Sequence, residues 1–167
     1  GAGALYRYFR GEVRQLRERV TIPNATCFAP DGRTACFADT AEHVVWRVAL
    51  DEDGWPDGDW EIWLDHRDSG INPDGAVIDA DGRFWCAEWG GSRVACYDAD
   101  GKLVEEIPLD VTQPTCPAFG GSDLSTLFLT SARQGLPDEA LDEAPRSGMT
   151  LSVSLGATGQ TEHEVIP

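Results

Sequence analysis

The chain has 167 residues, of which 29 are Asp or Glu and 13 are Lys or Arg, giving a formal net charge of −16. Nucleic acids and anionic membrane surfaces are excluded as partners, because both repel a polyanion whose basic residues are scattered rather than clustered. No apolar run is long enough to cross a membrane. The 18 Gly and 10 Pro favour a turn-rich, all-β protein.

The first predicted elements are two short strands, Leu5–Phe9 and Val13–Leu16, on either side of a turn at Arg10-Gly11. Two short apolar runs separated by a glycine turn have the pattern of a β-hairpin. We interpret them as the last hairpin of a repeating unit, over about residues 4–20.

The first full unit covers residues 23–65 and begins at Pro23-Asn24. Its Asp31-Gly32 pair lies between two short apolar runs, which is a strong hairpin signal because Gly tolerates the positive φ of tight turns. The four expected strands are Thr26–Ala29, Thr34–Ala38, Val44–Ala49 and Trp60–Leu64.

The same pattern returns fifty residues later, over residues 73–109. Pro73-Asp74 takes the place of Pro23-Asn24, and Asp81-Gly82 supplies the hairpin turn. The expected strands here are Ala76–Asp79, Phe84–Ala87, Arg93–Tyr97 and Leu103–Leu109. A looser third copy over 114–166 begins at Pro114-Thr115, with strands expected at Leu124–Thr130, Gly148–Leu155 and Glu162–Ile166.

Repeated units of about 40–50 residues with four short strands each are typical of a β-propeller. A β-sandwich would explain the strands but not the repeat. We therefore predict a single propeller domain over residues 1–167, with about three and a half blades and an incomplete N-terminal side, because propellers typically close with about four to eight blades. The one helical pattern, Pro137–Ala144, falls in an expected surface loop.

The cysteines predict the redox environment. Their odd number and the absence of a CxxC pair argue against a disulfide framework and against a zinc finger. We expect buried free thiols in a reducing compartment, and hence a cytoplasmic protein. The five positions are Cys27, Cys36, Cys86, Cys96 and Cys116.

Asn24, Asp74 and Thr115 hold equivalent positions in the three units. Equivalent positions of propeller blades lie at equal radius, so side chains at the start of each innermost strand would face one central channel. An amide oxygen and a carboxylate there are hard ligands that suit Ca²⁺ or Mg²⁺ and that Zn²⁺ tolerates. The alternative is a local role, because Asn and Asp beside Pro and Gly are common in turns.

The ordered set of motifs resembles the second half of the SMP-30/gluconolactonase (regucalcin-like) family, over about Gly3 to Gly148. The motifs are IPNATCFAPDG, ADT, NPDGAVIDADGRFWCAEWGGSRVACYDADGKLVEEIPL and QPTCPAFGGSDLSTLFLTSAR. The resemblance implies a six-bladed propeller with one divalent metal ion in its channel, either Ca²⁺ or Zn²⁺, with Mg²⁺ and Mn²⁺ also associated with members. It makes Asn24 and Asp74 metal ligands and places a third ligand, a Glu, in an N-terminal segment that this chain does not contain.

The resemblance further implies metal-dependent hydrolysis of a sugar lactone to the open-chain aldonic acid. Asp74 would also act as the catalytic general base. Trp89, at the expected channel mouth, and Thr115 are candidate substrate-binding residues. Two alternatives stay open, namely a non-catalytic metal-binding or scaffold propeller and an inactive fragment that lacks the N-terminal metal ligand.

Overall fold

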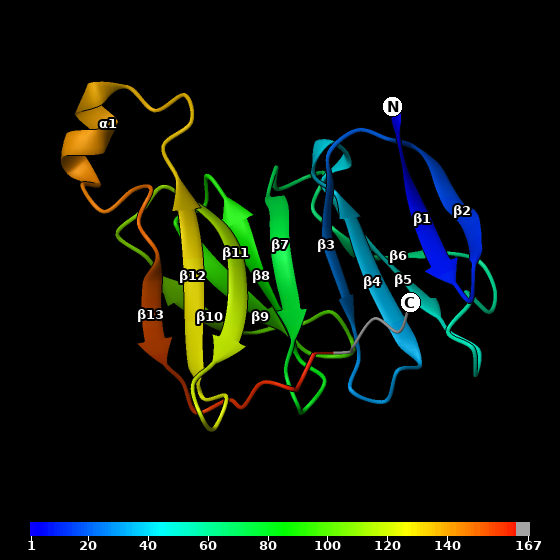
Figure 1. The fold of residues 1–167 in the computed structure, drawn as a ribbon. Coiled ribbons are helices and arrows are strands. Elements are labelled where there is room, and N and C mark those ends of the chain that lie inside the picture. Colours follow the sequence, from blue (N-terminus) through cyan, green and yellow to red (C-terminus); the bar gives the residue numbers. More distant parts are fainter. Residues whose placement is uncertain (163–167) are drawn as a thin grey trace.

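A computed structural model gives the fold of residues 1–162; all but the first residue of the strand expected at Glu162–Ile166 lies outside these described residues. The described chain forms antiparallel sheets that stand side by side, each built from strands consecutive in the sequence (Figure 1). The first sheet pairs β1 (Gly3–Phe9) with β2 (Glu12–Val20). The second comprises β3 (Pro23–Phe28), β4 (Thr34–Asp39), β5 (Val44–Ala49) and β6 (Glu61–Asp65).

The third sheet comprises β7 (Asn72–Ile78), β8 (Phe84–Trp89), β9 (Arg93–Tyr97) and β10 (Leu103–Pro108). The fourth comprises β11 (Gln113–Gly120), β12 (Thr126–Ala132) and β13 (Leu151–Ser154). Helix among the described residues is confined to the 3₁₀ turn η1 (Thr40–Glu42) and the exposed helix α1 (Asp138–Glu143). The prediction of an all-β fold is confirmed.

The Asp-Gly turns form the hairpins that the sequence predicted. Gly82 has a φ of 81°, a left-handed conformation that favours glycine. The buried carboxylate of Asp79 accepts hydrogen bonds from the backbone N–H of Asp81 and of Arg83, and from Nε1 of Trp85. This carboxylate therefore fixes the turn to the core of its own sheet.

Apolar side chains between neighbouring sheets form the core. One cluster joins the second and third sheets and another joins the third and fourth, with Trp85 and Phe84 completely buried. Four cysteines are free and buried as expected. Cys116 departs from that expectation and is exposed, because it lies on the innermost strand of its sheet, with its sulfur against Gly75 of the neighbouring sheet.

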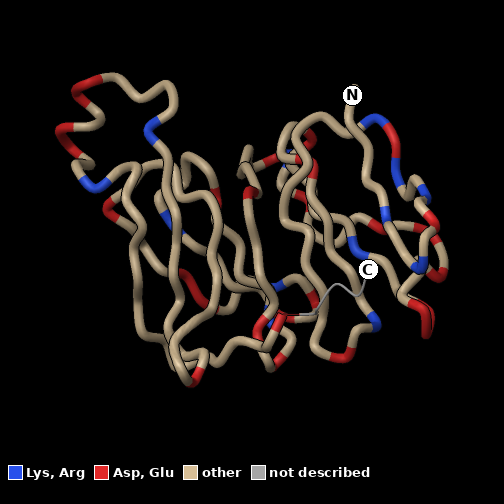
Figure 2. The backbone as a smooth tube through the Cα atoms, viewed as in Figure 1, with Lys and Arg blue, Asp and Glu red and all other residues tan. Residues whose placement is uncertain are grey.

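The charges lie mostly in the turns and loops at the ends of the strands (Figure 2). The first hairpin is an exception, because it carries several arginines. Three of them lie over tryptophan rings: Arg17 over Trp46, and both Arg7 and Arg14 over Trp55. None of the described residues belongs to a helix with the length and apolar character needed to span a membrane.

Candidate metal and substrate site

The innermost strands β3, β7 and β11 lie side by side and all begin at the same end of their sheets, at the top of Figure 1. Each strand carries one extra residue relative to its partner, between Asn24 and Cys27, between Pro73 and Ala76, and between Pro114 and Cys116. Such β-bulges redirect side chains away from the regular alternation. The bulge therefore recurs at the three positions that the sequence repeat marked.

Asn24 is oriented by a hydrogen bond from its amide nitrogen. Nδ2 donates to Thr40 Oγ1 at 2.8 Å, and Thr40 Oγ1 donates to the carbonyl oxygen of Pro73 at 2.6 Å. Because a carbonyl only accepts, the hydroxyl hydrogen of Thr40 is committed and the hydroxyl must accept from Asn24. The amide oxygen Oδ1 of Asn24 is left without a hydrogen-bond partner in residues 1–162.

Asp74 carries a half-buried carboxylate. Burial raises its pKa to about 6, and the hydrogen bond from the backbone N–H of Gly75 offsets this only in part. No Lys or Arg within the described part of the chain forms an ion pair with it. The strand β7 thus holds a partly desolvated anionic oxygen donor that has no counter-ion.

The structure brings Asn24 and Asp74 into one neighbourhood, because the Thr40 hydroxyl links Asn24 to the residue that precedes Asp74. Thr115 lies on the next inner strand, where its hydroxyl is 2.6 Å from Thr130 Oγ1. The strands β7 and β11 are very close here, because a Cβ added at Gly75 would lie 2.6 Å from the sulfur of Cys116.

Trp89 lies at the same end of the blade but on the second strand, paired with Asn72. It is half-buried and lines a cavity of about 260 Å³ together with Glu88, Ser69 and the glycines that follow. It is thus separated from the inner-strand positions by the width of one strand pairing.

Sequence reasoning missed two buried acids beside this site, Asp39 and Glu88. They pair with Pro23 and Pro73, the residues just before Asn24 and Asp74. Glu88 accepts hydrogen bonds from Tyr97 at 2.7 Å and from Arg93 at 2.6 Å. Their offsets from the two prolines differ by one residue, so only the strand pairing makes them equivalent and the repeat carried no signal.

Asp39 holds the segment that leads into β3. Its carboxylate accepts from the backbone N–H of Thr21 at 2.6 Å and of Ile22 at 2.8 Å, and it caps η1 by accepting from Ala41 at 3.2 Å. A single carboxylate therefore fixes the backbone two residues before Asn24 and also the start of η1.

The donor set fits a hard divalent cation. Asn24 Oδ1 and the Asp74 carboxylate are oxygen ligands of the kind that Ca²⁺ prefers, and neither is used by another side chain of the described residues. Residues 1–162 hold no group of three or more His, Cys, Asp or Glu that could bind a metal ion. The described residues therefore offer Asn24 and Asp74 as two candidate side-chain oxygen donors.

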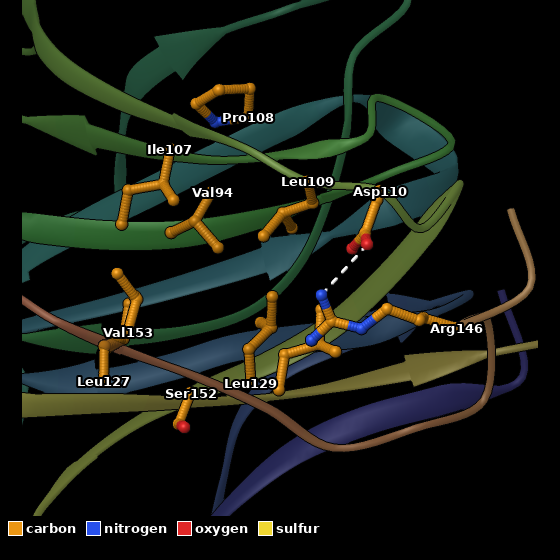
Figure 3. Close-up of a pocket in the computed structure, with 11 residues that line it drawn as sticks. Val94, Ile107, Pro108, Leu109, Asp110, Leu127, Leu129, Arg146, Ser152 and Val153 are labelled. Carbon is orange, nitrogen blue, oxygen red and sulfur yellow. Dashed lines mark hydrogen bonds and ion pairs between the residues drawn. The ribbon is translucent and has the colours of Figure 1, made fainter.

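A second cavity, of about 320 Å³, lies between the outer strands of the third and fourth sheets. Figure 3 shows Val94 and Ile107 facing Leu127 across it, and Arg146 pairs with Asp110 at 2.9 Å at one side. Its lining is apolar and its one carboxylate is already paired. It contains none of the candidate site residues.

Residues 1–133 match the family model described as SMP-30/Gluconolactonase/LRE-like region. The chain belongs to this family. A solved relative, a calcium-binding protein named regucalcin from Agrobacterium tumefaciens strain C58, is 40% identical with a TM-score of 0.92, over 97% of this chain and 55% of its own. The predicted fold, an all-β six-bladed propeller with about three and a half blades in this chain, is confirmed.

Two curated proteins are similar in sequence to this chain. One, from Rhizobium meliloti (strain 1021), bears the provisional name sugar lactone lactonase and is 42% identical over 96% of this chain and 55% of its own length. The other, 6-deoxy-6-sulfogluconolactonase from Pseudomonas putida, is 39% identical over 86% of this chain and 49% of its own. The chain thus spans about half the length of these relatives.

Proposed function

We propose that this chain is part of a sugar lactonase that uses one divalent metal ion, Ca²⁺ or Zn²⁺, to hydrolyse a lactone to the open-chain aldonic acid. The observation that carries the proposal is a pair of oxygen donors on neighbouring inner strands, Asn24 Oδ1 and the Asp74 carboxylate, neither of which has a side-chain partner among the described residues. Relatives named as lactonases support the same reading. Mg²⁺ and Mn²⁺ are also compatible with oxygen ligands.

Asn24 and Asp74 would hold the ion, which when bound polarises the lactone carbonyl and stabilises negative charge on its oxygen. The Asp74 carboxylate accepts a proton from the attacking water, because it is half-buried and has no basic partner among the described residues that would hold its charge. The hydroxyl of Thr115 and the ring of Trp89 contact the sugar, because hydroxyl groups and aromatic faces suit a polar ring with apolar C–H faces.

The second candidate is metal binding without turnover. It is favoured by the number of ligands, since the described residues supply two oxygen donors and no cluster of three acidic, His or Cys side chains. The solved relative described as a calcium-binding protein is consistent with such a role.

The test is gluconolactone hydrolysis followed by pH-stat titration. It compares this chain alone with the same chain joined to the N-terminal half of a family relative, each with Ca²⁺ or Zn²⁺ and each with EDTA. Asp74→Ala removes the proposed base, and Asp100→Ala, an exposed carboxylate in a hairpin turn, is the matched control. We expect EDTA-sensitive turnover in the completed protein, lost by at least about a hundredfold in Asp74→Ala and unchanged in Asp100→Ala.

Metal binding without turnover of any sugar lactone would favour the second candidate. Turnover that survives both EDTA and Asp74→Ala would refute the assignment of this site.

A further inference from the structure

The Asn24 side chain has two chemically different ends, of which only the oxygen binds a cation. A terminal amide rotates between two orientations of similar shape, so something must select the one that directs Oδ1 away from the protein. The Thr40 hydroxyl makes this selection. It donates its hydrogen to Pro73 O at 2.6 Å, so its oxygen can only accept a hydrogen bond from Nδ2 of Asn24, at 2.8 Å.

Thr40 is itself held firmly. Its backbone N–H donates to Ile22 O at 3.0 Å, and its own carbonyl accepts from the backbone N–H of His43 at 3.2 Å. The Asp39 carboxylate binds the N–H groups of both Ile22 and Ala41. The backbone of Thr40 is therefore fixed, and its hydroxyl cannot follow a rotation of the amide without breaking its bond to Pro73 O.

The same turn ties the second sheet to the third. Thr40 binds the carbonyl of Pro73, and Nδ1 of His43 lies 3.0 Å from the carbonyl of Ile71, to which it must donate. Both acceptors precede Asp74 on the chain. The contacts that orient Asn24 thus also fix the start of the strand that carries the second oxygen donor.

The other two blades lack this device. Thr40 is the residue after Asp39, which pairs with the first proline of the inner strand, Pro23. The residues at the same place in the next two blades are Trp89 and Ala132. Neither has a hydroxyl. A carboxylate such as Asp74 has two equivalent oxygens and needs no such selection, so the hydroxyl occurs at the one metal-ligand position that is an amide.

We propose that Thr40 is a positioning residue that selects the metal-binding orientation of Asn24 across the boundary between two blades. The inference rests on the proposed function, since it assumes that Asn24 Oδ1 is a ligand. Thr40 touches neither the ion nor the substrate in this role and acts only through the amide.

The test uses Thr40→Val, which keeps the shape of the side chain but removes the hydroxyl, and Thr40→Ser, which restores it. Thr34→Val is the matched control, because it makes the same change at the far end of β4, where the hydroxyl has no partner within residues 1–162. Calcium affinity is measured by calorimetry with Ca²⁺ alone on the completed protein, in which this chain is joined to the N-terminal half of a family relative. The side-chain NH₂ signals of Asn24 are followed by NMR.

We expect Thr40→Val to weaken Ca²⁺ binding by about tenfold or more and to move the Asn24 signals toward those of a free amide. The Ca²⁺ affinity of Thr40→Ser should stay within about threefold of that of the unmutated protein. The affinity of Thr34→Val should equal that of the unmutated protein. A folded Thr40→Val variant with native affinity, or with native Asn24 signals, would overturn the proposal.

A second pair of variants separates orientation from general stability. In an Asn24→Asp background both side-chain oxygens are equivalent, so adding Thr40→Val should cost no further affinity. An undiminished loss in that background would show that Thr40 acts by supporting the fold rather than by orienting the amide. If the completed protein does not bind Ca²⁺, the metal site itself fails, whereas native binding with an unaffected Thr40→Val removes only the role of Thr40.

Discussion

The ionisation of Asp74 links the candidate site to stability. Burial raises its pKa from 3.8 to about 6, and no basic side chain of the described residues compensates. In the unfolded chain the carboxyl group ionises near its ordinary pKa, whereas in the folded chain it stays protonated to a higher pH. The free energy of unfolding therefore falls as pH rises from about 4 to above 6, and a cation bound by the carboxylate would remove this penalty.

Asp74→Asn is thus expected to stabilise the metal-free chain at neutral pH. A shift of about two pKa units corresponds to roughly 3 kcal/mol, which solvent screening at this half-buried group reduces to about 1 kcal/mol. The gain should fall to a small fraction near pH 4, where the carboxyl is protonated in the folded chain and about half protonated in the unfolded chain. Urea unfolding at pH 4 and pH 7.5 measures it, with Asp100→Asn as control; a loss of stability at pH 7.5 would contradict the assignment.

At this scale the sequence predicted the ligand candidates but not their surroundings. Asn24 and Asp74 follow from the fifty-residue offset of the repeat, which needs no three-dimensional information. Thr40 does not, because it lies sixteen residues from Asn24 and its second partner, Pro73, belongs to another sheet. Single-sequence patterns carry no information on such a pairing.

At the scale of elements, the close approach of β7 and β11 depends on Gly75. A methyl group there would lie 2.6 Å from the sulfur and 2.8 Å from Cα of Cys116, so part of the contact is with backbone. Neighbouring inner strands therefore cannot keep their spacing with any larger residue at this position.

Gly75→Ala is expected to lower the free energy of unfolding by about 2 kcal/mol or more, since the two sheets must separate locally. Gly156→Ala is the control, because a Cβ there meets nothing within 4 Å and its φ is not positive. Denaturant unfolding of both variants measures the difference. Equal stability of the two variants would show that the sheets accommodate the methyl group.

The strand positions were largely predictable and the bulges were not. Hydrophobic alternation around the Asp-Gly turns marks the strands, and β8 and β9 begin at the predicted Phe84 and Arg93. The bulges in β3, β7 and β11 add one residue each without a distinctive residue type, so alternation alone cannot locate them. The inner strands also begin before the expected Thr26 and Ala76, because Pro23 and Pro73 already pair with residues of the neighbouring strand.

For the whole molecule, the net charge of −16 complicates any metal titration. A divalent cation screens the general repulsion between acidic groups as well as filling a specific site, and both effects raise stability. Only measurements at fixed ionic strength separate them.

At constant ionic strength, Ca²⁺ at ten times its dissociation constant should stabilise the native chain by about 1.4 kcal/mol, which raises its melting temperature by about 3–6 °C. Asn24→Ala should lose most of this shift, since it removes one ligand without changing the charge. Calorimetric melting in CaCl₂ against an ionic-strength-matched NaCl solution gives the answer. Equal shifts in both proteins would mean that Ca²⁺ acts only by screening.

Cys116 makes the inner wall of these blades accessible to labelling chemistry. It is the one exposed thiol of the five, and it lies against Gly75, the neighbour of Asp74 in the chain. Partial cover by the adjacent strand raises its pKa, so maleimide coupling would proceed best in mildly alkaline buffer. A fluorescent dye attached there would sit beside the candidate site, and its emission would report the arrival of a metal ion or a sugar without any assay of turnover.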